Sequence, residues 1–505
     1  MSSLNPIPSP LLQVLLVPVV FVPIVYLLGR KIGKNVGYLA LIPLAYVTAL
    51  LALSFPGVLS QGQVTEEYLW APIAGLKFGF LLDGISLPLA LTIAFLCLVT
   101  TLFSMPYMEH KINEQGGDKT AYSIYFSLYL LYAVGMIGTV LATNLVEFYL
   151  FYELMLIPSW LLLSTFGYGQ KERIGIMYFL WTHIGALSVL AGILAMFSVV
   201  GSFEIANMHV LASVNPQLAT WVSAALLLGF LVKMAVFGIH VWLPYAHAEA
   251  PTPISALLSP AMIGLGAYGI VRLVITPFGG VFSGFADILS IWALVTMVYG
   301  GLMALAQDDI KRLLAYSSIS QMGYLFLGLS SLTSLGISGS IFHYVSHGLS
   351  KCILFSVAGT IIYQTHGVRS IGKLGGLAKK MPLTALAALI GFLGIAGVPP
   401  LSGFQSEWLL FSGVLASAMA TGSVLRLVVA IFAIFSSVLT AGYGLWTVRR
   451  IFFGPLAKHM EDAKDPPLLM MVPLILLMIV AIILGIYPAL VTDILIPAIS
   501  RIVLP

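Results

Sequence analysis

Apolar residues are gathered along the chain into long runs that short polar stretches separate. A helix that crosses the hydrocarbon of a bilayer needs about 20 predominantly apolar residues, and the runs reach that length. They fall at roughly 9–29, 36–56, 82–105, 119–142, 145–166, 174–200, 218–243, 254–277, 285–307, 312–332, 336–363, 381–417, 424–447 and 466–490. The pattern predicts an all-α polytopic membrane protein of about fourteen transmembrane helices.

Two of the runs contain residues that interrupt helices. The seventh continues through Phe237-Gly238 into HVWLPYAHAEAPTPIS, and the twelfth is split by GVPPLSGFQSEW. Backbone groups that an unwound turn frees are tolerated at membrane depth only where protein or a watery cavity surrounds them. We therefore predict that helices 7 and 12 are broken inside the bundle, next to an ion path.

The positions of the two breaks predict an internal repeat. The seventh helix is the fourth of helices four to eight, and the twelfth is the fourth of helices nine to thirteen. Two consecutive five-helix blocks must cross the membrane in opposite senses, as inverted repeats do, and their working residues are expected near the midplane. The predicted organisation is 1–118 for helices 1 to 3, 119–278 and 279–450 for the two repeats, and 451–505 for an inner loop and helix 14.

Composition and charge narrow the class of protein. With 60% hydrophobic and 8% charged residues, the 505-residue chain leaves no room for a separate soluble domain. Cys97 and Cys352 both lie in apolar runs, which argues against a disulfide framework and an iron–sulfur ligand set. The net charge of +4 lies in short loops, so it reports orientation in the membrane and not binding to nucleic acid.

Basic residues alternate between the loops as the positive-inside rule requires. When the N-terminus is placed outside, all but six of the 23 lysines and arginines fall in inner loops. The exceptions are Lys77, Arg426 and Arg501 on or near the outer side and Lys233, Arg272 and Lys351 within helices. We therefore expect both termini on the outer side of a cytoplasmic membrane, with the Arg272 side chain reaching the outer interface.

Four ionisable residues stand deep within the apolar runs, namely Glu153, Lys233, Lys351 and Glu407. A charge at the bilayer centre costs about 2.5–3.5 kcal/mol on insertion scales, so each needs a reason to be there. A glutamate at pairing distance favours the charged form of a buried lysine, so Glu153 and Lys233 would form a two-state store for a proton. The alternative is a static ion pair that fixes helix packing.

His343, His347 and Lys351 recur at every fourth residue of the eleventh run. This spacing places them on one face of a helix, about 6 Å apart along its axis, where they could relay protons. A metal site is the alternative, since HYVSH has the histidine spacing of a zinc hydrolase, but Tyr344 stands at the position of the catalytic glutamate. For His343 alone, a histidine held by neighbouring helices is an equal alternative.

Glu407 follows the break in helix 12, where a buried carboxylate suits the last station of a proton path. Three histidines are secondary candidates, namely His183 in the sixth run and His240 and His247 around the seventh-helix break. Each of these three histidines is equally consistent with a structural role.

A polar turn separates the ninth and tenth runs and carries Asp308, Asp309, Lys311 and Arg312. Opposite charges so close together usually mark a solvated stretch. We expect this turn to lie in water on the inner side or to face a neighbouring subunit.

Five stretches of the sequence are distinctive: FYELMLIP, LVKMAVFGIHVWLPYAHAEAPTPISALL, AQDDIKRLLAYSSISQMGYL, HGLSK and GFQSEW. They resemble the antiporter-like membrane subunits of respiratory complex I over nearly the whole chain. Related members occur in multisubunit cation/proton antiporters, membrane-bound hydrogenases and archaeal dehydrogenases. Within this family the chain is most similar to the M-type subunit, because Glu407 stands where paralogues more often carry lysine.

The resemblance implies fourteen core helices with two inverted five-helix repeats. It also implies roles for the buried residues: Glu153 and Lys233 form the coupling pair of the first half-channel, His347 lies on the connecting axis, and Glu407 is the exit-side residue.

The chain departs from the family in the eighth helix, where a lysine is usual but Gly264 stands in this sequence. Lys351 lies where M-type chains tend to be apolar and where other antiporter-like subunits carry an HxxxK pattern. We therefore predict that Lys351 supplies the displaced cation.

Together these features predict a proton-translocating membrane subunit of a complex I-type respiratory oxidoreductase, driven by redox chemistry in partner subunits. The resemblance implies no cofactor in this chain, with flavin, iron–sulfur clusters and quinone in partner subunits, and antiporter-like paralogues on its flanks. The alternative is a cation/proton antiporter subunit with sodium as a counter-ion. An intramembrane metal hydrolase built on His343 and His347 is a remote alternative. The expected surroundings are lipid and neighbouring membrane subunits, with no nucleic acid.

Overall fold

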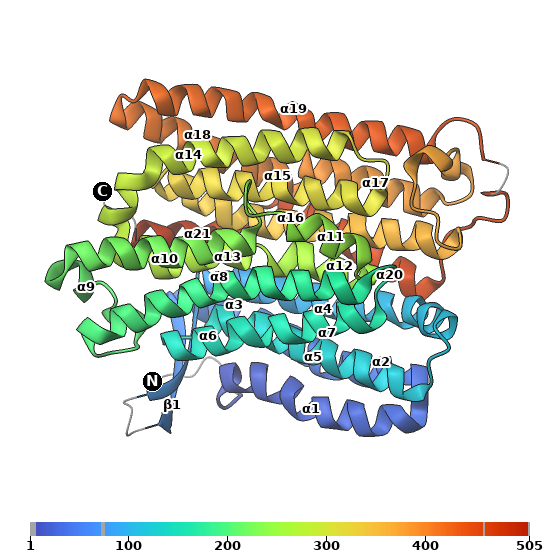
Figure 1. The fold of residues 1–505 in the computed structure, drawn as a ribbon, viewed down its shortest axis with the longest axis horizontal. Helices are drawn as coiled ribbons and strands as arrows, with labels where there is room; N and C mark the ends of the chain where they lie inside the picture. The colour runs from blue at the N-terminus through green and yellow to red at the C-terminus, as the bar shows by residue number, and fades with distance from the viewer. Residues whose placement is uncertain (1–6, 72–75, 458–459, 503–505) are drawn as a thin grey trace.

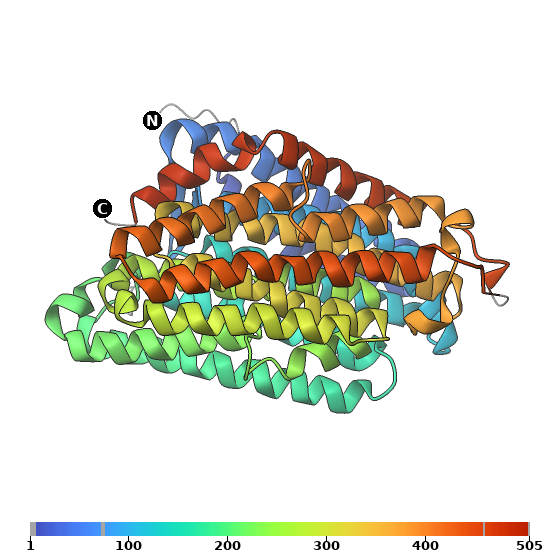
Figure 2. The ribbon, with the colours of Figure 1, turned by 90° about the horizontal axis from the view of Figure 1, so that it is seen from above.

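The computed structural model describes residues 7–71, 76–457 and 460–502. Its helices lie nearly parallel along the long axis of the molecule (Figure 1). Seen from above, the blue N-terminal helices and the red C-terminal helices lie together along one edge (Figure 2). Such a stack suits a bilayer, because each helix satisfies its own backbone hydrogen bonds. Lys458, which the sequence assigns to the last inner loop, lies outside the described residues.

Helices occupy every apolar run that the sequence predicts. The chain begins with α1 (Pro10–Ile32), α2 (Val36–Leu53), α3 (Phe55–Gln61) and α4 (Ser86–Glu114). The first predicted repeat holds α5 (Lys119–Leu141), α6 (Leu145–Leu154), α7 (Leu156–Phe166), α8 (Lys171–Val200), α9 (Val210–Val214), α10 (Pro216–Met234), α11 (Trp242–Glu249), α12 (Thr252–Leu257) and α13 (Leu265–Ile270). The second holds α14 (Thr276–Leu305), α15 (Ile310–Ser330), α16 (Ser334–Gln364), α17 (Pro382–Ile395), α18 (Ser402–Thr421) and α19 (Val424–Phe452), and the chain ends with α20 (Leu468–Ile486) and α21 (Ala489–Ser500). Within the described ranges, 10 helical stretches are long and apolar enough to span a membrane, so the count of fourteen crossings stays a prediction.

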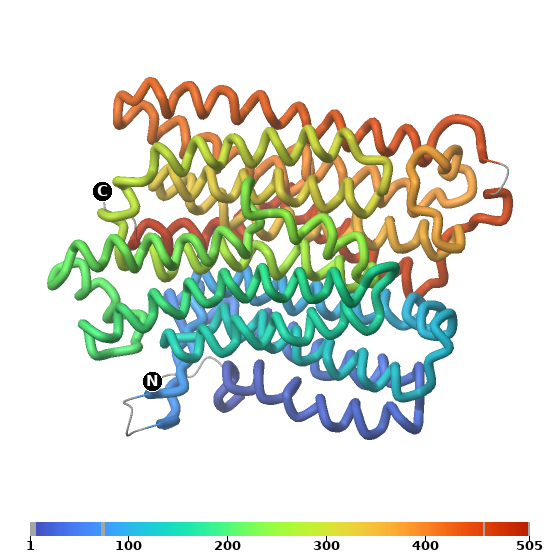
Figure 3. The backbone as a smooth tube through the Cα atoms, in the orientation of Figure 1, coloured from blue at the N-terminus to red at the C-terminus, as the bar shows by residue number. Residues whose placement is uncertain are grey.

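Both predicted helix breaks are present. α10 ends at Met234 and α11 begins at Trp242, and the chain between them leaves the helical path in the middle of the bundle (Figure 3). α17 ends at Ile395 and α18 begins at Ser402, with Gly397 at φ 65° between them. The prediction of unwound turns in helices 7 and 12 is confirmed.

The backbone groups freed at the first break find partners within the protein. The Trp242 indole N–H donates to the Val232 carbonyl at 3.2 Å, and the Trp292 indole N–H donates to the Phe237 carbonyl at 2.8 Å. The Phe237 amide in turn donates to the Thr296 hydroxyl at 3.2 Å. These bonds meet the requirement that broken backbone at membrane depth be satisfied by protein.

The eighth apolar run contains two π-helical turns that the sequence did not predict, Leu258–Met262 and Val271–Ile275. Such turns widen a helix locally and occur often at functional sites. The Tyr344 hydroxyl of α16 donates to the Ala261 carbonyl at 2.9 Å. A Cβ atom added to Gly264 would overlap the Tyr344 ring. That ring therefore occupies the space that an eighth-helix side chain would fill.

Helix α16 is the buried centre of the bundle. Every residue from Gly336 to Ile362 is buried. The helix packs against α4 and α12 from the first half of the chain and against α15, α17, α18 and α20 from the second. Polar side chains on α16 are consequently shielded from lipid on every side.

A two-stranded hairpin, which the sequence did not predict, lies between α3 and α4. Strand β1 (Gln63–Ala71) pairs antiparallel with β2 (Leu76–Asp83). Phe80 of β2 also forms a bridge to Ala142, directly after α5. The hairpin therefore covers the end of the bundle at which α5 finishes.

The two predicted repeats begin with helices of opposite direction. A cavity of about 490 Å³ beneath the hairpin is lined both by Ala142, directly after α5, and by Thr276, the first residue of α14. α14 therefore starts at the end of the bundle at which α5 stops, as Figure 1 also shows. This reversal is what an inverted repeat requires.

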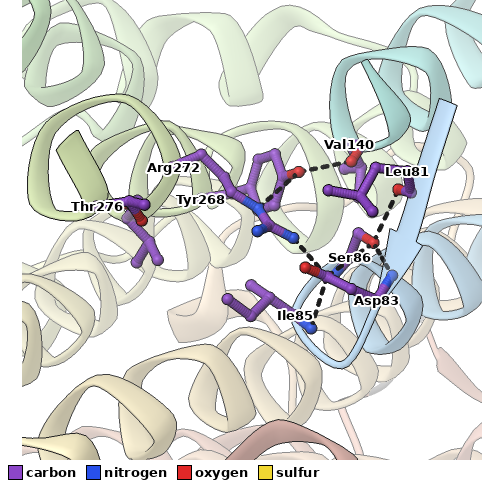
Figure 4. Close-up of polar contacts among 9 residues, drawn as sticks. Leu81, Asp83, Ile85, Ser86, Val140, Tyr268, Arg272 and Thr276 are labelled. Carbon is purple, nitrogen blue, oxygen red and sulfur yellow. Dashed lines mark hydrogen bonds and ion pairs between the residues drawn. The ribbon is translucent and has the colours of Figure 1, made fainter. Parts of the chain in front are cut away.

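Arg272 reaches the hairpin that covers one end of the bundle. Its guanidinium forms an ion pair with Asp83 at the end of β2, and each of the two side chains is only 12% exposed (Figure 4). Arg272 Nε donates to the Tyr268 hydroxyl at 3.2 Å, and that hydroxyl donates to the Val140 carbonyl at 2.6 Å. The sequence did not predict this ion pair, because it depends on the hairpin, which places a carboxylate beside Arg272. The reach of Arg272 to the outer interface stays a prediction.

Replacing Asp83 with alanine would leave the Arg272 guanidinium buried without a counter-charge. Breaking a buried pair in this way costs about 3–5 kcal/mol of folding free energy. We predict a clearly lower melting temperature for the Asp83→Ala variant, measured on the detergent-solubilised complex. The control is Glu67→Ala, which removes the exposed Glu67–Lys77 pair of the same hairpin and should leave the melting temperature unchanged. Equal melting temperatures for the two variants would contradict the structural role of Asp83.

Candidate functional site

The first candidate cluster is built on α6 and α8. Glu153 lies in the last turn of α6, and its Oε2 atom is 3.0 Å from Nδ1 of His183 on α8. The two side chains are 17% and 34% exposed, and the His183 ring stacks on Phe179 with centroids 5.3 Å apart. Oε1 of Glu153 is buried and has no hydrogen-bond partner among the described residues. The structure thus joins the secondary candidate His183 directly to Glu153.

Lys233 belongs to the same region but does not contact Glu153. It lies in the last turn of α10, directly before the helix break, and is 2% exposed. Its Nζ atom lies 4.5 Å from the centre of the Tyr152 ring, and no described carboxylate is within 4.0 Å of it. Consecutive residues of a helix point about 100° apart, so the Tyr152 ring and not the neighbouring carboxylate faces the ammonium group. The structure therefore pairs Glu153 with His183, and the expected direct ion pair with Lys233 is not formed.

The second cluster follows the buried face of α16. His343 is held on both sides of its ring: Nδ1 lies 3.0 Å from the Ser406 hydroxyl and Nε2 lies 2.8 Å from Oε1 of Gln321. The ring also stacks on Tyr324, with centroids 5.5 Å apart. One turn later, His347 is 1% exposed, and neither of its nitrogens has a partner among the described residues.

Lys351 completes the row of polar residues on α16. It is fully buried, and Nζ donates to the Leu314 carbonyl at 3.0 Å and to the Ser317 hydroxyl at 2.5 Å. The Ser317 hydroxyl lies 2.7 Å from that of Tyr443 on α19. The ammonium group is therefore held by neutral oxygen atoms and has no carboxylate partner within the described part of the chain.

Glu407 lies in the second turn of α18, after the break in helix 12, and is 7% exposed. Its Oε1 atom is buried and has no hydrogen-bond partner among the described residues. A Cβ atom on Gly397 would overlap the carboxylate. Glycine at this break therefore makes room for the acid, and its φ of 65° also favours glycine.

The two histidines around the seventh-helix break differ in their surroundings. His240 accepts a hydrogen bond from the Gly238 amide at 3.2 Å and contacts the Tyr299 hydroxyl at 3.1 Å, which suits a structural role in the break. His247 is fully buried on α11, and neither of its nitrogens has a partner among the described residues. It stacks on Phe355 of α16 with centroids 4.8 Å apart. His247 therefore connects the broken helix with the helix that carries Lys351.

Three polar residues of the site escaped the sequence analysis because they carry no charge. Ser317 and Gln321 lie one turn apart on α15, and they contact Lys351 and His343 respectively. Ser406 on α18 contacts the opposite side of the His343 ring. The only signal in the sequence was the four-residue spacing of Ser317 and Gln321 within an apolar run.

The geometry offers no ligand set for a metal ion. No group of three or more His, Cys, Asp or Glu side chains that could hold one occurs in the described ranges. Both ring nitrogens of His343 already contact Ser406 and Gln321, so this histidine does not pair with His347 as a ligand.

Two known protein families match most of the chain between them. Residues 142–435 match the family described as NADH:quinone oxidoreductase/Mrp antiporter, TM. Residues 70–116 match the family described as NADH-Ubiquinone oxidoreductase (complex I), chain 5 N-terminus.

Relatives of similar length occur in archaea and bacteria. The chain is 32% identical over 493 residues to F(420)H(2) dehydrogenase subunit M of Methanosarcina mazei, covering 95% of each protein. It is 30% identical over 475 residues to NADH-quinone oxidoreductase subunit M of Rickettsia prowazekii, covering 92% of each.

Solved structures share the fold. A chain of respiratory complex I from Thermus thermophilus superposes with a TM-score of 0.84 at 27% identity, covering 98% of this chain and 99% of that one. A chain of the Mrp complex from a Dietzia species gives a TM-score of 0.87 at 23% identity, covering 98% of both, which supports the fold alone. With the matching family over 142–435 and the relatives named subunit M, the chain belongs to the family of membrane subunits shared by NADH:quinone oxidoreductases and Mrp antiporters, as an M-type member.

Proposed function

We propose that the chain carries protons across the membrane as the M-type subunit of a complex I-type NADH-quinone oxidoreductase. The observation that carries this proposal is the set of buried ionisable groups on and beside α16, in a family whose named relatives include an NADH-quinone oxidoreductase subunit M. Burial of such groups in a membrane bundle is costly and usually marks an ion pathway.

The proposed path has a station at each helix break. Lys233 stands before the first break, Glu407 stands after the second, and the α16 row of His343, His347 and Lys351 lies between them. Neither ring nitrogen of His347 has a partner among the residues that the structure describes, so the ring can both accept and donate a proton.

Coupling in the first half is proposed to use the alternative partners of Glu153. Its carboxylate contacts His183 and stands beside Tyr152, whose ring covers the Lys233 ammonium group. A carboxylate that moved from His183 to Lys233 would favour the charged form of the lysine, and its return would favour release of the proton. Movement of the Glu153 carboxylate would in this way change the proton affinity of Lys233.

The second half is proposed to use Lys351 in place of the eighth-helix lysine of the family. Tyr344 of α16 fills the space beside Gly264. Lys351 lies seven residues after Tyr344 on α16, and it donates hydrogen bonds to Leu314 and Ser317. Because the oxygen atoms that hold Lys351 are neutral, the lysine can lose its proton without leaving a buried carboxylate unpaired.

Redox chemistry is assigned to partner subunits. Flavin, iron–sulfur clusters and quinone belong there, and other antiporter-like membrane subunits are proposed to flank this chain in a cytoplasmic membrane. Both termini are proposed to lie on the outer side, and residues 119–278 and 279–450 are proposed as the two functional halves. The second candidate is a sodium/proton antiporter subunit, because the family description that matches residues 142–435 also names the Mrp antiporter.

Lys233→Ala removes the buried lysine directly before the first break, so we predict loss of proton uptake while the complex still assembles. The measurement is acidification of inverted membrane vesicles driven by NADH, with NADH oxidation followed in parallel. Lys34→Ala is the matched control, because the Lys34 side chain is 57% exposed. Wild-type proton uptake by Lys233→Ala would contradict the proposed path, and a requirement for sodium would favour the antiporter.

Lys351→Ala is predicted to abolish proton uptake in the same vesicles, because Gly264 supplies no amine in the second half. The triple variant Lys351→Ala/Gly264→Lys/Tyr344→Ala moves the amine to the eighth helix and clears the Tyr344 ring from its space. Partial recovery of uptake is expected from this variant. Full activity of Lys351→Ala alone would show that Lys351 does not replace the missing lysine.

A further inference from the structure

Lys311 is buried, contrary to the expectation that its turn would be solvated. It lies in the first turn of α15 with no exposed surface, whereas the next residue, Arg312, is exposed. The nearby acid Asp309 is already paired with Arg369 at 2.5 Å. The Lys311 ammonium group instead donates to the Ala250 carbonyl. The predicted solvated turn is therefore wrong for Lys311, because α15 begins beneath the residues that join α11 to α12.

The surroundings of Lys311 are unusual for a structural lysine. Its Nζ atom lies 5.5 Å from the centre of the Tyr168 ring, and Nζ of Lys111 lies 3.7 Å from the same ring. An ammonium group has three donors, and the only acceptor found for this one among the described residues is the Ala250 carbonyl. Burying a cation with so few hydrogen-bond partners costs free energy, so we expect the charge of Lys311 to have a function.

A chain of hydroxyl groups connects this region to the surface. The Tyr168 hydroxyl contacts that of Tyr107, which lies 2.8 Å from the Thr252 hydroxyl. A cavity of about 30 Å³, enough for a water molecule, is lined by Tyr107, Tyr168, His110 and Glu114, among other residues. The side chains of His110 and Glu114 are 34% and 50% exposed, so this cavity lies next to the inner solvent.

Toward the interior, Lys311 is followed by groups that can receive a proton. His247 precedes Ala250 by three residues on α11, and neither of its ring nitrogens has a partner in the described part of the protein. His247 stacks on Phe355, one turn from Lys351 on α16. His247 therefore lies on the element whose end Lys311 holds through Ala250, and it packs against the helix that carries Lys351.

We propose that Lys311 is a proton-loading residue at the inner mouth of the second half, a role that rests on the proposed function of the chain. In one transfer, the Lys311 ammonium group gives a proton through a bridging water to a neutral ring nitrogen of His247 and becomes an amine. The amine then takes a proton from inner water through the hydroxyls of Tyr107 and Tyr168. The Ala250 carbonyl holds the amine in place during both steps.

Lys311→Arg separates this role from a purely structural one. Arginine keeps the charge and the donors that hold the Ala250 carbonyl, but it does not release a proton. We predict that the rate of NADH-driven proton uptake falls about tenfold or more in this variant, as for the loss of a proton-transfer group. Arg312→Gln, on the exposed side of the same turn, is the control and should match the wild type. Wild-type uptake by Lys311→Arg would show that Lys311 only holds the Ala250 carbonyl in place and does not load protons.

A second variant covers the case in which Lys311→Arg does not assemble. Tyr168→Phe keeps the ring beside both lysines and removes only the hydroxyl, so it should assemble and take up protons several-fold more slowly. A normal rate would overturn the hydroxyl relay. Lys233→Ala and Lys351→Ala are measured in the same vesicles. If both of these pump normally, the proposed function fails, whereas normal pumping by Lys311→Arg alone removes only the loading role.

Discussion

The structure depends on one constraint, which is that hydrocarbon does not solvate charge. Ionisable side chains at membrane depth are therefore largely enclosed by protein, and those on α16 are enclosed by the helices that surround it. Because all of its residues from Gly336 to Ile362 are buried, the histidines and the lysine on this helix meet only other protein groups. The surrounding helices can then offer apolar faces to lipid, as the exposed Trp221, Phe435 and Ile288 side chains do.

The same constraint explains the form of the helix breaks. An unwound turn frees backbone groups, and at the first break two indole N–H groups and the Thr296 hydroxyl form hydrogen bonds with them. The second break also creates space, because Gly397 leaves room for the Glu407 carboxylate. A break thus supplies both polar backbone and a gap for a side chain, and a proton path needs both.

Much of this arrangement follows from the sequence. Apolar runs locate the helices because their length must match the bilayer, and the glycine and proline clusters locate the two breaks. The row of His343, His347 and Lys351 follows from the four-residue period of a helix. These features are local, so a single sequence contains them. The roles of the site residues stay a prediction.

The features that escaped prediction depend on contacts between distant parts of the chain. The hairpin is short and lies between two apolar runs, so no long periodic pattern marked it. Arg272 finds Asp83 only because that hairpin folds over the end of the eighth helix. Lys311 is buried by α11 and Tyr168, which no local charge pattern reveals. Glu153 pairs with His183 because α6 packs against α8, although the family pattern pointed to Lys233.

The most direct test of the central claim, that protons pass along the buried groups to Glu407, is the number of protons moved per NADH oxidised by the Glu407→Gln complex. Glutamine keeps the size and polarity of the side chain but holds no exchangeable charge at this site. The account predicts that this ratio falls below that of the wild type, while Glu407→Lys, which restores the residue common in paralogues, retains part of it. An unchanged ratio in an assembled Glu407→Gln complex would contradict the account.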